Sequence, residues 1–374
     1  MLHNTMLHNT MLHNTMLHRK NIHTIYNIQT IHNPQHFPIS NTKMLFFDIF
    51  YKNNKIYMIM PIYNTPALPE HITLTVNNKV LRITESHVKD SDEPILIYIY
   101  EYITPPNSAI KVNVNLINNM KKTYDLIHIY TQAQKSTNKF LALTTLCKDD
   151  CYLFPLFYNY YKEQGVDHFY MYYNGVITPQ IRKVFNKPDV TLVEWNFHYW
   201  NPRGVKYPHH AQMGQMHHAL YKYGKDIYDY MIFCDLDEYL HIPKNKCIET
   251  IAEIADIAPN SEEYTNNTIR RFITHNPDID IFGFCNFWSN TIDGNIPNTP
   301  HLPNKFLSVL EPVEYLERSK NIYKVSSINT IGIHQVGYNF YSTMKHIVDL
   351  KMYHFYKWSS KGRVIENCTN IVEL

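Results

Sequence analysis

Short apolar or alternating runs fill the chain from residue 44 to residue 130, and turn-forming residues separate them. Asn-Asn pairs and a Thr-Pro-Pro-Asn stretch lie between the runs, and these residue types favour turns. Several short strands at such spacing are typical of an antiparallel β-sandwich. The predicted strands cover residues 44–51, 55–63, 72–76, 80–84, 95–103, 110–117 and 124–130.

From residue 140 the pattern changes to apolar runs that alternate with segments of helical spacing. One helical segment ends before Gly165, a residue type common just after a helix, and another begins at Thr178-Pro179, where proline takes the first helical position. Alternating strands and helices predict an α/β layer structure. The predicted strands cover residues 140–147, 166–173, 190–195 and 231–234, and the predicted helices cover 152–164, 178–185 and 212–223.

The same pattern divides the chain into three parts. Residues 1–18 contain three copies of Met-Leu-His-Asn-Thr and a truncated fourth, and a period of five fits neither a helix nor a strand. Residues 1–41 are therefore predicted to form a low-complexity, disordered tail. A β-sandwich-like domain is predicted over residues 42–136, and an α/β domain over residues 137–374, with a polar linker at 131–139.

Composition narrows the class of protein. The formal net charge of +2 gives no reason to expect a nucleic acid partner. No run approaches the roughly 18 apolar residues of a membrane span, and the N-terminus lacks a signal-peptide core. The six cysteines complete no zinc pattern, and Cys234 and Cys285 lie in apolar runs typical of buried thiols. We therefore expect a soluble cytoplasmic or other intracellular protein without an integral membrane segment.

Three acidic residues, Asp235, Asp237 and Glu238, follow the apolar run that ends at Cys234. In an extended chain alternate side chains point the same way, so Asp235 and Asp237 are expected to lie together. Two carboxylates leaving a buried strand are costly unless a positive charge lies between them, and Mg²⁺ or Mn²⁺ meets that need. Most Asp-x-Asp triplets are solvated loop acids, but here the chain returns to an apolar segment, which favours a metal site.

The Asp235-Leu-Asp-Glu-Tyr segment resembles the Asp-x-Asp-Glu-aromatic segment of metal-dependent glycosyltransferases with the GT-A fold, and most closely glycosyltransferase family 92 and related family 2-like enzymes. Gly165–Asn174 is similar to that family's Gly-Val-aspartate-His-aromatic strand, and His209–Ala219 resembles its Gln-bearing helix. Lys148-Asp149-Asp150 departs from the family pattern of a basic residue followed by Asn-Glu. The resemblance covers about residues 140 to 362.

The resemblance implies a GT-A domain that binds a nucleotide-diphosphate sugar together with Mn²⁺ or Mg²⁺. Asp237 is expected to bind the cation directly, and Asp235 to contact the ribose or the cation through water. Glu238 either supports the metal shell or pairs with a basic neighbour. A further metal ligand is expected from His354 or, as second choice, His334. The residues expected to contact the nucleotide sugar are Asp149, Asn174, Gln212, Gln215, Asp235 and Lys357.

Acceptor recognition is predicted for Ile281–His301. Phe284, Phe287 and Trp288 could stack on sugar rings, although half of this aromatic content is expected to be core. Asp293 is the nearest downstream acid that could deprotonate an acceptor hydroxyl, and it is equally a turn-former in Asp-Gly.

The sequence thus favours a metal-dependent glycosyltransferase that moves a sugar from a nucleotide-diphosphate donor, with UDP-sugar the expected donor, to a glycan or protein-linked glycan. One alternative is a nucleotidyltransferase, but the Gly-rich loop common in that class is missing from Thr144–Cys151. The other alternative is a glycan-binding or scaffold protein with an inactive transferase fold. The retained Asp235, Asp237 and His354 argue against loss of activity.

Overall fold

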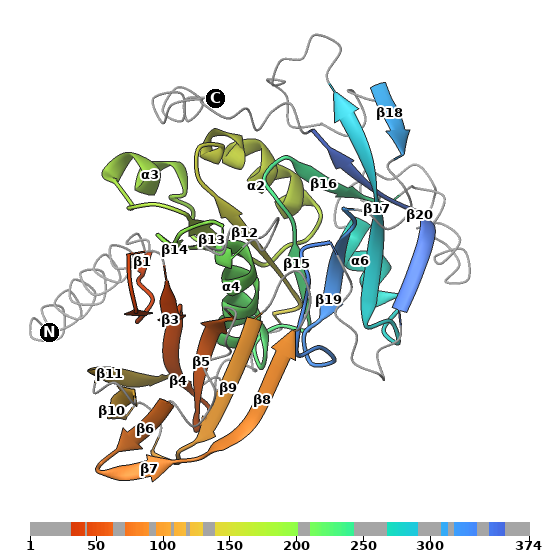
Figure 1. Ribbon diagram of the computed structural model, residues 1–374. Coiled ribbons are helices and arrows are strands. Elements are labelled where there is room, and N and C mark those ends of the chain that lie inside the picture. Colours follow the sequence, from red (N-terminus) through yellow and green to blue (C-terminus); the bar gives the residue numbers. More distant parts are fainter. Residues whose placement is uncertain are drawn as a thin grey trace, which may run out of the picture.

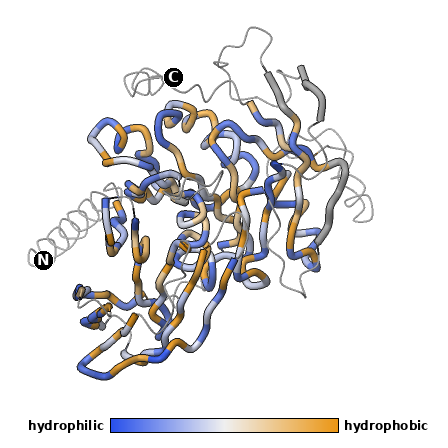
Figure 2. Tube along the Cα trace, viewed as in Figure 1, coloured by the Kyte–Doolittle hydropathy of each residue, from blue (hydrophilic) through white to orange (hydrophobic). Residues whose placement is uncertain are grey.

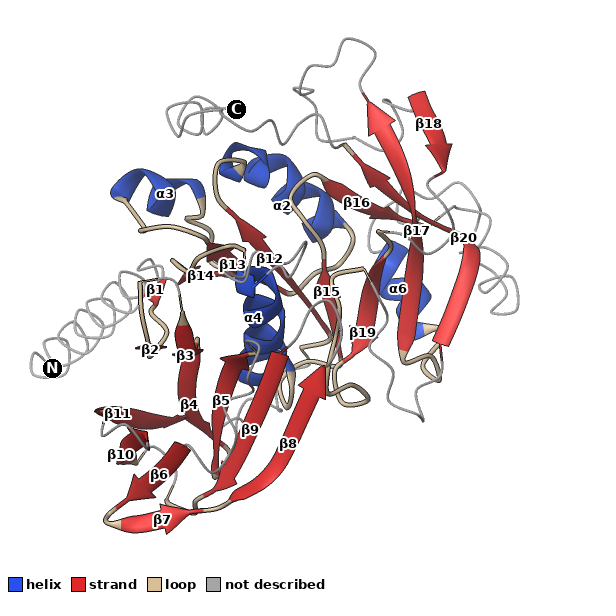
Figure 3. Cartoon of the chain, viewed as in Figure 1, coloured by secondary structure: helices blue, strands red, loops and turns tan. Residues whose placement is uncertain are grey.

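The computed structural model describes residues 31–41, 43–62, 72–89, 95–105, 108–116, 120–129, 139–200, 210–242, 268–290, 308–312, 318–334 and 344–355. Within them, two large β-sheets lie next to each other, and helices pack on the larger one (Figure 1). Strands, drawn red in Figure 3, are the commonest kind of element in the described chain, and the described α-helices all come after residue 139. The described residues include no helix with the length and apolar character that a membrane crossing requires.

The larger sheet is mixed, with a parallel centre. Strands β13, β12 and β15 lie next to each other in this order, and all pairs among them are parallel. All seven residues of β12 are buried, which explains why its sequence is a continuous apolar run rather than an alternating one. The strands predicted in the α/β part are confirmed. The sheet order is β1 (Ile31–His32), β14 (Val190–Glu194), β13 (His168–Tyr173), β12 (Leu141–Cys147), β15 (Tyr230–Phe233), β19 (Lys320–Lys324), β17 (Ile281–Asn290), β20 (Met344–His354) and β16 (Glu238–His241), with β18 (Ser308–Pro312) on β17.

The three predicted helices are present. Helix α2 (Phe154–Glu163) follows a short 3-10 turn and is succeeded by Gly165 at φ 90°, the left-handed conformation expected after a helix. Helix α3 (Pro179–Val184) is capped by Thr178, whose hydroxyl accepts a hydrogen bond from the Ile181 amide. Helix α4 (His210–His218) continues as the π-helical turn η3 (Ala219–Gly224). A further helix, α6 (Thr268–Thr274), precedes β17.

The N-terminal strands form one eight-stranded sheet. Its hairpin turns Asn53-Asn54 and Asn77-Asn78 have φ between 48° and 62°, the conformation of two-residue hairpin loops that asparagine tolerates. Side chains from both halves of the sheet, such as Leu74, Val112, Met58 and Tyr98, share one core. The order is β7 (Lys79–Leu81), β6 (Ile72–Val76), β10 (Ala109–Leu116), β11 (Lys121–Ile129), β4 (Asp48–Lys52), β5 (Lys55–Pro61), β9 (Ile95–Glu101) and β8 (Ile83–Lys89).

The segment 31–41 corrects the predicted extent of the disordered tail. Strand β1 pairs with β14 in the larger sheet, and β2 (Phe37–Pro38) pairs with β3 (Met44–Phe46). Phe37 is buried, and the Tyr223 hydroxyl lies 2.8 Å from His32 Nδ1. The polar composition predicts a tail. The prediction fails because the partners of β1 and His32 lie far away in the sequence.

The two sheets share a hydrophobic core. No described strand of residues 44–129 pairs with the larger sheet, yet buried side chains of β4, β5 and β9 pack with those of α4 and η3. Phe50, Ile59 and Ile97 belong to the same buried cluster as Trp195 and Leu220. Figure 2 shows the hydrophobic stretches along these strands. The N-terminal sheet therefore covers the outer face of helix α4, the helix that leads to the acidic segment.

Candidate active site

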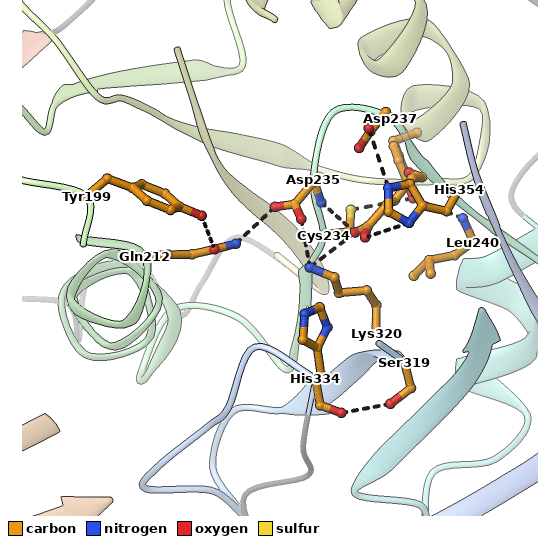
Figure 4. Close-up of polar contacts among 12 residues, drawn as sticks. Tyr199, Gln212, Cys234, Asp235, Asp237, Leu240, Ser319, Lys320, His334 and His354 are labelled. Atoms are coloured by element: carbon orange, nitrogen blue, oxygen red, sulfur yellow. Dashed lines mark hydrogen bonds and ion pairs between the residues drawn. The ribbon is translucent and has the colours of Figure 1, made fainter. Parts of the chain in front are cut away.

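The three acids lie in a tight turn between two strands. Strand β15 ends at Phe233, and β16 begins at Glu238. The Asp235 amide donates to Glu238 Oε2 at 2.8 Å, and the Glu238 amide donates to the Asp235 carbonyl at 3.1 Å. The extended chain expected across Asp235 and Asp237 is thus replaced by a turn, because these reciprocal bonds bend the backbone. The two aspartates consequently have different partners (Figure 4).

Asp235 is held from two sides. Its Oδ1 accepts a hydrogen bond from Gln212 of helix α4 at 3.0 Å, and its Oδ2 accepts one from Lys320 at 2.9 Å. Tyr199 in turn donates to the Gln212 side-chain oxygen at 2.9 Å, which fixes the orientation of that amide. Although burial opposes the effect, Lys320 lowers the pKa of Asp235. Asp235 is therefore a carboxylate in a fixed position.

Lys320 supplies a buried positive charge between two of the acids. It opens strand β19, is almost wholly buried, and lies 3.3 Å from Glu238 Oε2 as well as next to Asp235. Burial opposes protonation, yet Asp235 and Glu238 raise the pKa of Lys320. Burial raises the pKa of Glu238 to about 7, and Lys320 counters this. Of the two alternatives for Glu238, pairing with a basic neighbour is the one that the structure contains.

Asp237 faces His354. Strand β20 pairs with β16 so that His354 lies opposite Glu238, and His354 Nε2 lies 3.5 Å from Asp237 Oδ2. The Phe355 amide donates to the Asp237 carbonyl at 2.8 Å, which holds the two segments together. Burial opposes protonation of His354, but Asp237 raises its pKa above the usual value. The structure thus brings together His354 and Asp237, two of the four residues predicted to bind the cation.

These two side chains can hold one divalent cation. Ligands about 2.1 Å from a common ion are at most about 4.2 Å apart, and 3.5 Å lies within that limit. Both are of a type that Mn²⁺ accepts. Among the described residues no group of three His, Cys, Asp or Glu side chains could hold a metal ion, so the predicted set of four is divided. Two protein ligands suit a cation that completes its shell with phosphate oxygens and water.

His334, the second-choice metal ligand, lies near Asp235 and Lys320. The His334 carbonyl accepts a hydrogen bond from Ser319 at 2.8 Å, next to Lys320, and its ring lies near enough to help lower the pKa of Asp235. Figure 4 shows His334 on the Lys320 side of the site rather than beside Asp237.

Two predicted contacts instead maintain the sheet. Asn174 donates to the Trp195 and Phe197 carbonyls at 2.8 Å, and Gln215 donates to Thr144 of β12 at 2.7 Å. Both amides are buried. Their hydrogen bonds connect the end of β13 with the segment after β14, and the middle of β12 with helix α4.

Asp150, rather than its neighbour, is the acid near the centre. Asp149 is exposed, whereas Asp150 is partly buried and accepts a hydrogen bond from the Lys148 amide at 3.0 Å. Burial raises the pKa of Asp150 to about 7, and the charges of Asp237 and Asp235 add to this effect. Sequence reasoning chose Asp149 because adjacent positions in a turn cannot be told apart by pattern.

The predicted acceptor strand is β17. Phe284 is buried in the core and pairs with Lys320 across the sheet, so it is a core residue rather than a stacking platform. Phe287 packs against the same core, and the Trp288 backbone pairs with that of His354. Asn286, between these positions, is buried, and neither amide atom has a hydrogen-bond partner in the described chain. Asp293 and Lys357 lie outside the described residues.

A fixed carboxylate, a buried lysine and an Asp–His pair thus lie together at the end of a parallel strand. The model of glycosyltransferase family 92 matches residues 149–373, more than half of the chain. The protein is therefore a glycosyltransferase, and it belongs to glycosyltransferase family 92. A search of curated proteins found no match.

Proposed function

We propose that the protein transfers a sugar from a nucleoside-diphosphate donor, with a UDP-sugar as the expected donor, to a carbohydrate acceptor, and that one divalent cation assists. The placement of Asp237 and His354 at 3.5 Å, beside the fixed Asp235, is the observation that supports this best. The cation would neutralise charge that develops on the departing diphosphate. A donor diphosphate would supply the ligands that the protein pair leaves open.

Asp235 and Lys320 have different roles beside that cation. Asp235, with both oxygens oriented by Gln212 and Lys320, would accept hydrogen bonds from ribose hydroxyls. Lys320 keeps Asp235 and Glu238 from repelling each other and cancels one negative charge near an anionic donor. Lys357 as a phosphate contact and Asp293 as the base remain predictions from the sequence.

Donor binding with and without metal tests the proposal. The intact protein is titrated with UDP- and GDP-sugars in the presence of Mn²⁺, Mg²⁺ or EDTA, and the midpoint of thermal unfolding is recorded. A ligand that binds only the folded state raises this midpoint by mass action. We expect one nucleotide class to raise it with Mn²⁺ and to lose most of the effect with EDTA. Equal shifts with EDTA would remove the cation from the proposal, and no shift with any donor would contradict the donor class.

A further inference from the structure

A short segment of the N-terminal sheet contacts helix α4 closely. Phe47 precedes β4, and its ring lies against Gly214 in the middle of α4. A Cβ added at Gly214 would come within 2.5 Å of this ring, so the helix and Phe47 approach each other as closely as a glycine permits. The segment Phe47–Lys52 belongs to the part of the chain that precedes the family match at residue 149.

Asp48 of this segment is buried and ion-paired with the same helix. His218 Nε2 lies 2.7 Å and Lys222 Nζ 2.8 Å from Asp48 Oδ2, while the Gln35 amide donates to Oδ1 at 2.6 Å. The Tyr172 hydroxyl lies 2.6 Å from His218 Nδ1, so a neutral His218 accepts from Tyr172 and donates to Asp48. Burial opposes ionisation, yet Lys222 and His218 lower the pKa of Asp48. These three donors fix the position of the Asp48 carboxylate.

Lys52, at the other end of β4, holds the end of the π-helical turn. It is fully buried and donates to the Tyr221 carbonyl at 2.9 Å and to the Lys225 carbonyl. These carbonyls belong to the last turn, where helices leave backbone oxygens without partners and where a positive charge is favourable. The Asp226 carboxylate lies 3.7 Å from the same ammonium.

The opposite end of helix α4 reaches the candidate active site. Gln212 donates to Asp235 at 3.0 Å, and Gln215 donates to Thr144 of the central strand at 2.7 Å. Trp195 also holds this end, since its indole donates to the Ala211 carbonyl at 2.8 Å. One helix therefore connects the contacts of Phe47–Lys52 with the hydrogen bond that orients Asp235.

We propose that Phe47–Lys52 is a positioning segment of the transferase site: it sets the place of helix α4 and, through Gln212, the orientation of Asp235. A hydrogen bond of 3.0 Å is lost when its partners separate by much more than 0.5 Å, so a small shift of α4 would release Asp235 on that side. The effect on donor binding rests on the proposed function, whereas the effect on the turn Asp235–Glu238 does not.

Three variants of the full chain separate positioning from general stability. Asp48→Asn keeps the shape of the side chain and removes the charge that Lys222 and His218 face. Gly214→Ala pushes Phe47 away from α4 without touching any charge. Val112→Ala is the matched control, because Val112 is fully buried in the N-terminal sheet on the core that does not include α4. All are measured at a temperature at which circular dichroism shows each protein to be folded.

Two measurements follow for each variant: calorimetric titration with UDP and Mn²⁺, and hydrogen–deuterium exchange of residues 230–242. We expect Asp48→Asn and Gly214→Ala to weaken UDP binding about tenfold and to speed exchange in this peptide. Val112→Ala should stay within twofold of wild type in both. The proposal would be overturned if all three variants bound UDP and exchanged as the wild type does. It would also be overturned if Val112→Ala lost as much UDP affinity and protection from exchange as the other two variants. The wild type is also titrated with GDP and Mn²⁺; if it binds neither nucleotide, the proposed function fails, and exchange alone decides the positioning role.

Discussion

Lys320 is the residue that balances the charge of the acidic segment Asp235–Glu238. The sequence requires a positive charge among three acids, and the structure supplies one as an ammonium between Asp235 and Glu238. A buried ion pair contributes little net stability when intact, but removal of one partner leaves an uncompensated charge. The lysine therefore explains how Asp235 and Glu238 are tolerated without metal, and it leaves Asp237 and His354 as the ligands of the proposed cation.

Replacing Lys320 with methionine should destabilise the metal-free protein by about 3–5 kcal/mol, since two buried carboxylates lose their shared partner. Urea denaturation in EDTA gives the free energy of unfolding. Lys324→Met is the matched control on the same strand, because Lys324 is partly exposed and lies 3.9 Å from Asp280. Its loss should stay below about 1 kcal/mol. Equal losses in the two variants would show that Lys320 does not balance the acids.

Asp237→Asn and Asp235→Asn should differ in what they remove. Asp237→Asn takes a ligand from the proposed cation and should lower transfer about a hundredfold while weakening Mn²⁺ binding, since a charge interaction of this kind contributes about 3 kcal/mol. Asp235→Asn should weaken nucleotide binding and leave Mn²⁺ binding closer to wild type. Electron paramagnetic resonance of Mn²⁺ with each variant measures this. Wild-type Mn²⁺ binding by Asp237→Asn would contradict the assignment of the ligand pair.

The site could be predicted only as far as local pattern and resemblance reach. Asp235, Asp237 and the paired His354 came from a recognisable segment and a resemblance. Lys320 could not be found in this way, because it lies 85 residues from Asp235 and its sequence neighbours resemble those of any surface lysine at a strand start. Its role appears only when β19 pairs beside β15.

At the scale of elements, periodicity predicts the parallel strands and the three helices between them, because each forms from a local run. The arrangement of β19, β17, β20 and β16 was not predictable, since a parallel pair occurs there among antiparallel ones and the paired strands are far apart in the sequence. The π-helical turn η3 was not predicted either, because its sequence does not distinguish it from an α-helix. Its contacts with Asp48 and Lys52 appear only in the folded chain.

The contact between β4 and helix α4 should be sensitive to acid. Burial and Lys222 lower the pKa of His218 to about 4, although Asp48 opposes them, while the unfolded value is near 6.5; His32 also lowers it. A depressed folded pKa means that stability is complete above pH 6.5 and is lost as the pH falls toward 4, by up to about 3 kcal/mol. His218→Gln should flatten this dependence between pH 7 and 5. Urea denaturation at several pH values measures it.

The matched control for that titration is His198→Gln, at an exposed position. Other histidines with a lowered pKa, such as the half-buried His168, titrate in wild type and variant alike, so they cancel in the difference between the two proteins. An unchanged slope in His218→Gln would show that titration of His218 does not cause the loss of stability in acid.

At the scale of the whole molecule, the predicted division into a β part and an α/β part describes strand pairing but not side-chain packing. Seven apolar residues of the N-terminal sheet, namely Phe47, Phe50, Tyr57, Ile59, Ile95, Ile97 and Ile99, are buried with Trp195, α4 and η3. Sequence pattern could not show this, because β4, β5 and β9 are buried on both faces and the partner of each face lies elsewhere in the chain.

A protein that begins at residue 139 should therefore not fold stably. Burial of a large apolar side chain contributes about 1.5–3 kcal/mol, so seven of them together contribute roughly 10–20 kcal/mol, as much as the whole stability of a typical domain. The truncated chain would also lose the carboxylate that Lys222 faces and the lysine that holds η3. We expect weak near-ultraviolet circular dichroism, binding of a hydrophobic dye and no cooperative unfolding.

A chain that lacks only residues 1–30 is the control for this truncation. It keeps strand β1, Gln35 at Asp48 and Phe37 in its core, so its free energy of unfolding should stay near that of the full chain. Removal of residues 1–41 should give an intermediate loss, because the amide that binds Asp48 Oδ1 and the β2–β3 pair go with it. A fragment 139–374 that unfolds cooperatively and binds UDP with Mn²⁺ as the full chain does would show that the N-terminal sheet is a separable neighbour. In that case Phe47–Lys52 could not be what places helix α4.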